Sequence, residues 1–273
     1  MIFLSRRRVK RINFNRVWAT TLRHMMTWPR SLERIADAFW WPSFSLFLWG
    51  LVTIFLERQT GMYQLFITLF MGGVIMWLFV YRSQEEMGLM FLQEAWDRNL
   101  LNMFSSPLTI WEFTIAAFLL SFIKLMISVA WMTFLAYLLF QFNLFRIGWI
   151  LIPYAGSLLI TGGILGIIIN SLIIRYGYRI QVFAWTLVQI LQPFSGVFYP
   201  LDIMPQWMQL VARVIPTSYI FEGMRRVLQD GFVDYSGLLM ATLLNGIYFV
   251  FAVWFFLWSY QEAREHGMLM KFS

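Results

Sequence analysis

The 273-residue sequence contains no cysteine, two histidines and only three lysines. Without cysteine it can form neither a disulfide nor a thiolate metal site, and His24 and His266 have no partner at the spacing of helical metal ligands. None of the lysines follows a glycine, so the Gly-Lys-Ser/Thr loop that binds nucleotide phosphates is missing. We therefore expect no metal, cofactor or catalytic site in this chain. Any ATP that drives it must be hydrolysed, with Mg²⁺, by a separate chain.

Charge is scarce as well. Charged residues make up 13% of the chain, against about 25% in soluble domains, whereas 60% of the residues are hydrophobic and 19% are aromatic. This composition predicts an integral membrane protein. Six continuously apolar runs approach the roughly 20 residues that a helix needs to cross a bilayer, near residues 38–56, 62–81, 114–140, 149–174, 181–199 and 237–260. Because the runs do not alternate, they predict an all-α protein with six transmembrane helices and not a β-barrel.

Basic residues gather ahead of the first run, at Arg6, Arg7, Arg8, Lys10, Arg11, Arg16, Arg23, Arg30 and Arg34. Since Lys and Arg concentrate in cytoplasmic segments, we expect both termini to be cytoplasmic and the protein to lie in the plasma (inner) membrane. No apolar region suits a cleavable signal peptide. The net charge of +7 is then a topology signal and not a sign of nucleic-acid binding. The predicted parts are a cytoplasmic segment 1–37, a transmembrane domain 38–260 and a cytoplasmic tail 261–273.

Residues 14–27 predict an amphipathic helix at the membrane interface. Arg16 and Arg23 share one face, and the opposite face carries Trp18, Leu22, Met25 and Met26. Pro29 should end or bend this helix, and Ser31 should start the next one. The helix could also be a simple topology anchor.

A second helix outside the bilayer core is expected within the cytoplasmic loop 82–110. Glu94 and Arg98 are spaced as a stabilising i, i+4 pair, and an apolar ridge consists of Trp96, Leu100 and Met103. Such a helix can dock on a soluble partner or lie on the membrane, and the residues alone do not decide between the two.

Polar residues inside the runs indicate a second kind of site, because each must find a partner or face water. On one face of the fifth run lie Gln181, Trp185, Gln189 and Gln192, and the first run has a weaker counterpart in Ser43 and Thr53. The amides could contact a substrate or join helices. Gly162 and Gly166 have the spacing of a close helix contact. Lys124 is the clear ionisable residue inside a run, and no role can be assigned to it.

Prolines interrupt the chain between the fifth and sixth runs, over residues 200–231. Pro200 and Pro205 should break the fifth helix, and Pro205 can start a short helix. Pro216 breaks the chain again, Thr217 can cap a second helix and Gly231 can close it. Irregular backbone at membrane depth must be buried or must face water, so we expect a re-entrant pair in the outer leaflet, with Trp207 and Tyr219 at the interface. Within the second helix, Glu222 can pair with Arg225 or Arg226.

The run Ser195-Gly-Val-Phe-Tyr-Pro200-Leu201, followed by Met204-Pro205-x-Trp207, Ile215-Pro216-x-x-Tyr219, Glu222-x-x-Arg225 and Gly231, resembles the signature of type-2 ABC exporter permeases. The resemblance implies a dimer with a second permease copy or paralogue, placed on two ABC ATPase subunits. It implies that residues 93–104 form the coupling helix in the ATPase groove. The first, second and fifth spans would line the path, and the re-entrant pair would close its outer end.

The expected function is therefore that of a permease subunit that moves a hydrophobic or amphiphilic compound, such as a drug, an antibiotic or a lipid-like molecule, outward. The signature is most similar to the drug and antibiotic efflux branch. An aromatic path could instead carry a polysaccharide or a lipid-linked glycan. A third possibility is a membrane assembly factor that transports nothing.

Overall fold

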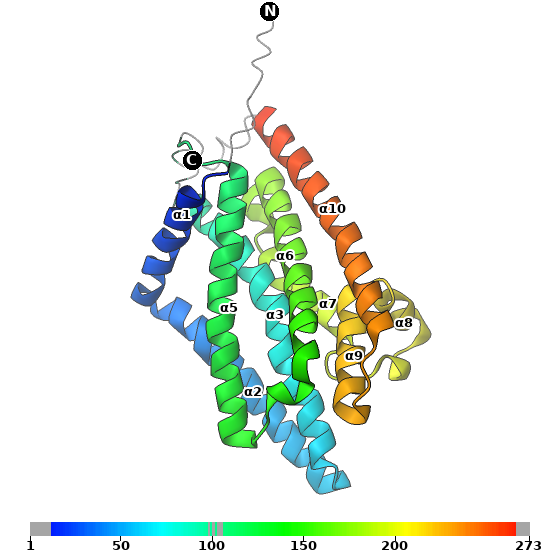
Figure 1. Cartoon of the computed structure of the whole chain (residues 1–273). Coiled ribbons are helices and arrows are strands. Elements are labelled where there is room, and N and C mark those ends of the chain that lie inside the picture. The colour runs from blue at the N-terminus through cyan, green and yellow to red at the C-terminus, as the bar shows by residue number, and fades with distance from the viewer. Residues whose placement is uncertain (1–11, 98, 100–101, 103–105, 266–273) are drawn as a thin grey trace, which may run out of the picture.

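The computed structural model describes residues 12–97, 99, 102 and 106–265. This described part is helical and contains no strand, which confirms the predicted all-α class. Five long helices form a bundle (Figure 1): α2 Leu32–Thr60, α3 Tyr63–Trp96, α5 Ile110–Phe140, α6 Leu151–Tyr176 and α10 Tyr235–Glu265.

Shorter elements lie around this bundle. They are α1 Phe14–Thr27, α7 Phe183–Leu191, α8 Gln206–Ala212 and α9 Pro216–Asp230. Tight 3₁₀ turns connect them: η1 Trp28–Arg30, η2 Leu144–Ile150, η3 Gly177–Ile180, η4 Gln192–Ser195 and η5 Leu201–Ile203. α1 packs on α5, and α7 packs on α3 and α6.

Local signals set several helix ends. Ser31 caps α2 by accepting a hydrogen bond from the amide of Arg34, as its position predicts, and Gly61 ends the helix with a left-handed φ of 70°. Thr109 and Glu112 form a reciprocal capping box at the start of α5. α1 has the bounds that its amphipathic pattern predicts.

Among the described residues, five helices are long and apolar enough to cross a membrane: Arg34–Thr60, Phe66–Glu94, Ile110–Phe140, Leu144–Tyr176 and Tyr235–Ala263. The fifth expected span, over residues 181–199, is not one of them. Its regular part, α7, has nine residues, because Pro193 enters the first turn of η4 and Gly196 takes a left-handed φ of 62°. The helix is thus broken upstream of Pro200, where the sequence predicts the break.

The helix ends gather at two ends of the bundle (Figure 1). At one end, Arg16 of α1 contacts Glu112 at the start of α5, and Arg175 of α6 pairs with Glu262 of α10. At the other end, the rings of Trp149 in η2 and Tyr235 at the start of α10 lie 6.5 Å apart. The chain between α6 and α10 therefore begins at one end of the bundle and finishes at the other.

α3 is longer than the sequence predicts. The expected span ends at residue 81, but the helix continues to Trp96, because residues 82–93 contain no proline to stop it. The additional turns bring four charged residues into the candidate span: Arg82, Glu85, Glu86 and, at its end, Glu94. This corrects the expectation that Lys124 is the one clear ionisable residue inside a span, and the predicted loop 82–110 begins as helix.

Two glycines let α6 approach α3 closely. A Cβ atom at Gly162 would lie 2.5 Å from the main-chain oxygen of Val80, and one at Gly166 would lie 2.8 Å from the Cβ of Met87. Small residues at this spacing allow helices in lipid to pack backbone against backbone. The predicted packing role of both glycines is confirmed.

Candidate functional site

A cavity of about 840 Å³ opens between α2, α3 and α7. Aromatic side chains line much of it: Trp41, Trp49, Trp77, Tyr81, Trp96, Trp185 and Phe198. The polar lining includes three amides and seven charged groups: Gln93, Gln189, Gln192, Arg34, Asp37, Arg82, Glu85, Glu86, Asp97 and Lys124. Sites for organic molecules have volumes of about 300–1,000 Å³ and combine apolar walls with a few polar groups, so the cavity is large enough to bind one.

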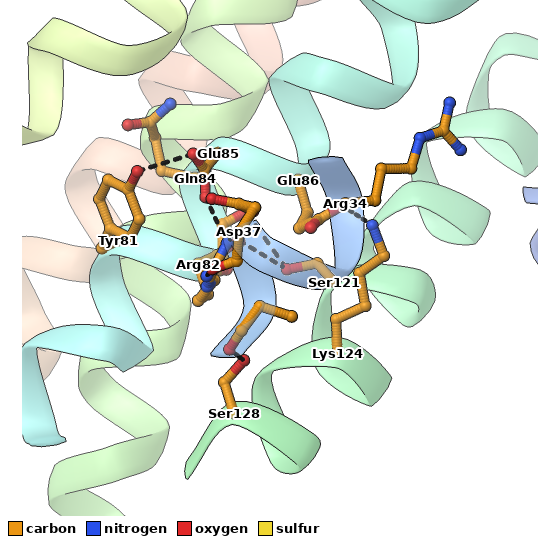
Figure 2. A network of polar contacts seen from close by, with 12 residues as sticks. Arg34, Asp37, Tyr81, Arg82, Gln84, Glu85, Glu86, Ser121, Lys124 and Ser128 are labelled. Carbon is orange, nitrogen blue, oxygen red and sulfur yellow. Dashed lines mark hydrogen bonds and ion pairs between the residues drawn. The ribbon is translucent and has the colours of Figure 1, made fainter. Parts of the chain in front are cut away.

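Arg82 is the centre of the charged wall, which Figure 2 shows. Its Nη1 donates to Oδ2 of Asp37 and, at 2.9 Å, to Oε2 of Glu85, while Nη2 donates to the main-chain oxygen of Asp37. The hydroxyl of Tyr81 donates to the other oxygen of Glu85 at 2.7 Å. Arg82 is only 1% exposed. A charge this deep in a membrane bundle is stable only when it is paired, and such charges commonly mark functional sites.

Lys124 of α5 supplies the second buried ion pair. Its Nζ donates to Oε2 of Glu86 at 2.6 Å and lies 5.4 Å from the centre of the Trp28 ring in η1. The residue that had no role in the sequence therefore connects α5 to α3 and η1.

Three of the four residues in the predicted stripe line the cavity, namely Trp185, Gln189 and Gln192, whereas Gln181 does not. The alignment of the three follows from the helical periodicity of α7 and its continuation into η4.

The residues predicted on α2, Ser43 and Thr53, do not line the cavity. Ser43 accepts a hydrogen bond from Nε1 of Trp131 at 2.9 Å, and Thr53 donates to the main-chain oxygen of Trp49 at 2.8 Å. Ser43 therefore joins α2 to α5, and the Thr53 hydroxyl is satisfied within α2. The cavity face of α2 carries Trp41, Pro42, Ser45 and Trp49 instead.

Aromatic rings stack where the cavity meets the segment after η4. The ring centres of Trp49 and Phe198 lie 4.0 Å apart, and those of Trp49 and Phe70 lie 5.0 Å apart. The turn that carries Phe198 packs tightly on α3, because a Cβ atom at Gly73 would lie 2.7 Å from the main-chain oxygen of Val197. This stack closes one side of the cavity with apolar surface.

Two short helices, α8 and α9, lie where the proline pattern predicts them. Pro200 and Pro205 precede η5 and α8, and Pro216 occupies the first turn of α9. The cap prediction for Thr217 is wrong: its hydroxyl donates to Oγ of Ser195 at 2.7 Å and so ties α9 to η4.

Side chains of the predicted outer gate differ in exposure. Trp207 is exposed, and the hydroxyl of Tyr219 donates to the main-chain oxygen of Arg213 at 2.8 Å. Arg225 is buried; it donates to Oε2 of Glu222 at 2.7 Å and to the main-chain oxygen of Gly196 at 2.5 Å. The predicted pair between Glu222 and Arg225 is therefore present, and it braces α9 against the turn after η4.

Glu94, predicted to contact a partner, is buried against α1. Its carboxylate accepts from Arg23 and, at 2.6 Å, from Nδ2 of Asn99, and Nε2 of His24 lies 2.8 Å away. Burial of the imidazole, together with the positive charges of Arg23, Arg34 and Lys124, lowers the pKa of His24 to about 4. At pH 7 the ring is neutral, and Arg23 is the ionic partner of Glu94.

Trp96 ends α3 with an exposed side chain, as a docking surface requires. The other predicted docking residues, Arg98, Leu100 and Met103, lie outside the described residues. α1 turns Arg16 and Arg23 toward the bundle and leaves Trp18, Leu22 and Met26 exposed. This arrangement suits a helix that lies on a membrane surface.

The Glu94→Gln variant is expected to loosen α1. Arg23 and His24 would lose their shared carboxylate, and a buried hydrogen-bonded charge contributes about 1–3 kcal/mol. Hydrogen exchange of the α1 amides should speed up, while amides in the middle of α6 should keep their protection. Glu265→Gln, an exposed change at the same end of the bundle, should leave α1 unaltered. Equal exchange of α1 in both variants would show that Glu94 does not hold this helix.

The sequence interpretation missed the charged wall. Asp37 was assigned to the cytoplasmic segment, and Arg82, Glu85 and Glu86 were assigned to a loop. One signal could have placed the last three: they lie at helical spacing in a stretch with no helix breaker. Their partners Asp37 and Lys124 come from other helices, which no local pattern indicates.

An apolar helical bundle that holds ionisable residues at a cavity beside candidate membrane-crossing helices is typical of membrane transport proteins. Residues 17–229 match the family described as ABC-2 type transporter, so the chain belongs to that family. Its members are membrane components of ABC transporters without an ATPase of their own. No curated protein shows a significant match to the chain.

Proposed function

We propose that this chain is the permease subunit of an ATP-driven exporter that moves a hydrophobic or amphiphilic compound outward across the plasma membrane. The observation that carries the proposal is the cavity between α2, α3 and α7. These are the first, second and fifth elements of the predicted span order, which the resemblance assigns to the translocation path. The rings and amides of the lining suit a cargo with apolar surface and hydroxyl or carbonyl groups.

The chain between α6 and α10 would supply the sixth crossing. This segment connects opposite ends of the bundle (Figure 1). It therefore crosses the bundle through η3, α7 and η4, without a continuous helix. Interrupted helices at membrane depth commonly form substrate sites in transporters. In this proposal α8 and α9 lie in the outer leaflet, and the end with α1 faces the cytoplasm.

The partner would be an ABC ATPase that docks at the cytoplasmic end, near Trp96. Family membership supports this, since such permeases normally work with an ABC ATPase. Glu94 would act indirectly, by joining the end of α3 to α1. We propose that two permeases, identical or paralogous, pair so that their cavities face each other.

Reconstitution tests the proposal. The permease should co-purify with an ATPase that carries a Gly-Lys-Ser/Thr loop, and vesicles that contain both should concentrate amphiphiles on the outer face only with ATP. Replacing both Gln189 and Gln192 by leucine should change which compounds stimulate ATP hydrolysis, by about tenfold for those that hydrogen-bond the amides. Gln229→Leu, an exposed change on α9 away from the cavity, is the matched control.

Three outcomes would alter the assignment. Stimulation by lipid-linked glycans alone would replace the amphiphile by a glycan. A stable complex that binds an ATPase yet moves no compound would favour an assembly factor. An unchanged ligand profile in the double variant would assign Gln189 and Gln192 to packing.

A further inference from the structure

We propose that the cavity selects lipophilic organic cations, in which an aromatic or aliphatic body carries a protonated amine or a quaternary ammonium group. The inference rests on the proposed function, because it names the cargo class of the same cavity. Its basis is the charge balance of the buried wall, together with the indole rings that face the same space.

Counted by formal charge, this cluster has one more negative group than positive groups. Its carboxylates belong to Asp37, Glu85 and Glu86, and its cations are Arg82 and Lys124. Arg82 is shared between two carboxylates, and Lys124 is paired with the third, so neither cation is free for a ligand (Figure 2).

The other charged groups that line the described part of the cavity leave this charge balance unchanged. They are Arg34 and Asp97, which carry opposite charges. The guanidinium of Arg34 donates to Oγ1 of Thr27 at 2.7 Å and points away from the cluster (Figure 2). A cationic ligand would therefore bring the lining to neutrality, whereas an anion would add to an existing excess.

The tryptophan rings of the cavity also favour a cationic ligand. Indole faces attract cations more strongly than other aromatic rings do, and five tryptophans line the cavity: Trp41, Trp49, Trp77, Trp96 and Trp185. The protein already uses this contact next to the cavity, where the ammonium of Lys124 lies 5.4 Å from the centre of the Trp28 ring.

A matched pair of ions tests the proposal directly. Tetraphenylphosphonium and tetraphenylborate have nearly the same size and shape and opposite charges. The full-length permease in zwitterionic lipid nanodiscs should bind the phosphonium saturably and at least about tenfold more tightly than the borate, the preference expected from one uncompensated charge at low effective dielectric. Equilibrium dialysis with empty discs as the blank measures this ratio.

Charge variants show which residues cause the preference for the phosphonium over the borate. Asp37→Asn, which removes the surplus carboxylate at a partly exposed side chain, should lower the ratio about tenfold. The exposed Gln189 allows a milder pair: Gln189→Glu should raise the ratio and Gln189→Lys should lower it, which keeps the test valid if Asp37→Asn does not fold. Asp202→Asn removes the same charge from an exposed residue outside the lining and should change nothing.

The outcomes separate this inference from the proposed function. Equal binding of the two ions, or a ratio that ignores both Gln189 variants, overturns the cation preference even where the complex with its ATPase exports other compounds. Preferential phosphonium binding without ATP-driven export leaves the cation site in place and rejects the export function.

Discussion

Replacing Arg82 by methionine is expected to lower the free energy of unfolding by about 3–5 kcal/mol, the cost of leaving a buried charge without its partner. The guanidinium is 1% exposed and serves the carboxylates of Asp37 and Glu85 together. Without it, the hydroxyl of Tyr81 would be the one donor left to Glu85 among the residues that the structure describes. Equilibrium unfolding of the purified permease in mixed micelles measures the loss.

A second substitution shows whether charge is the cause. Adding Glu85→Gln to Arg82→Met should restore part of the lost free energy, because the amide removes the uncompensated charge and keeps the shape. Arg226→Met breaks an exposed pair with Asp234 and should cost less than about 1 kcal/mol. Equal losses at Arg82 and Arg226, or no recovery in the double variant, would mean that the buried network does not stabilise the fold.

The sequence predicted the features that depend on neighbouring residues. The bounds of α1, the cap at Ser31, the end of α9 at Gly231 and the pair between Glu222 and Arg225 were all predicted locally. The face of α7 that lines the cavity was predicted in the same way, because helical periodicity fixes which side chains share a face.

What the sequence could not predict depends on contacts between helices. A search for apolar runs assigns Arg82, Glu85 and Glu86 to a loop, because it treats charged residues as exposed. Their burial depends on ion pairs with Asp37 of α2 and Lys124 of α5, which lie far away in the sequence. For the same reason, the sequence did not show which face of α2 lines the cavity. The Ser43 hydroxyl does not face the cavity, because it accepts a hydrogen bond from Trp131 of another helix. A hydropathy pattern does not identify charged residues that are buried as ion pairs, and here such residues form one wall of the cavity.

The contact between α6 and α3 gives the second large effect, and Gly162→Val is expected to disrupt it. A Cβ atom there would lie 2.5 Å from the main-chain oxygen of Val80 and 2.7 Å from the Cβ of Ser83, and a backbone oxygen cannot turn aside as a side chain does. Overpacking typically costs about 1–3 kcal/mol and occasionally more, and two helices must separate here, so a loss of about 3 kcal/mol or more in the free energy of unfolding is expected.

Gly156 is the matched control on the same helix, because a Cβ atom there would meet nothing within 4 Å. Gly156→Val should change the free energy of unfolding by less than about 0.5 kcal/mol. The displaced turn of α3 carries Tyr81 and Arg82, so Gly162→Ala, which adds the Cβ atom alone and should displace the turn less than valine does, should also weaken ligand binding in the cavity. If Gly162→Val and Gly156→Val were equally stable, the close approach of α6 to α3 would be disproved. If Gly162→Ala lost stability without weakening binding, the contact would support the fold and would not set the shape of the cavity.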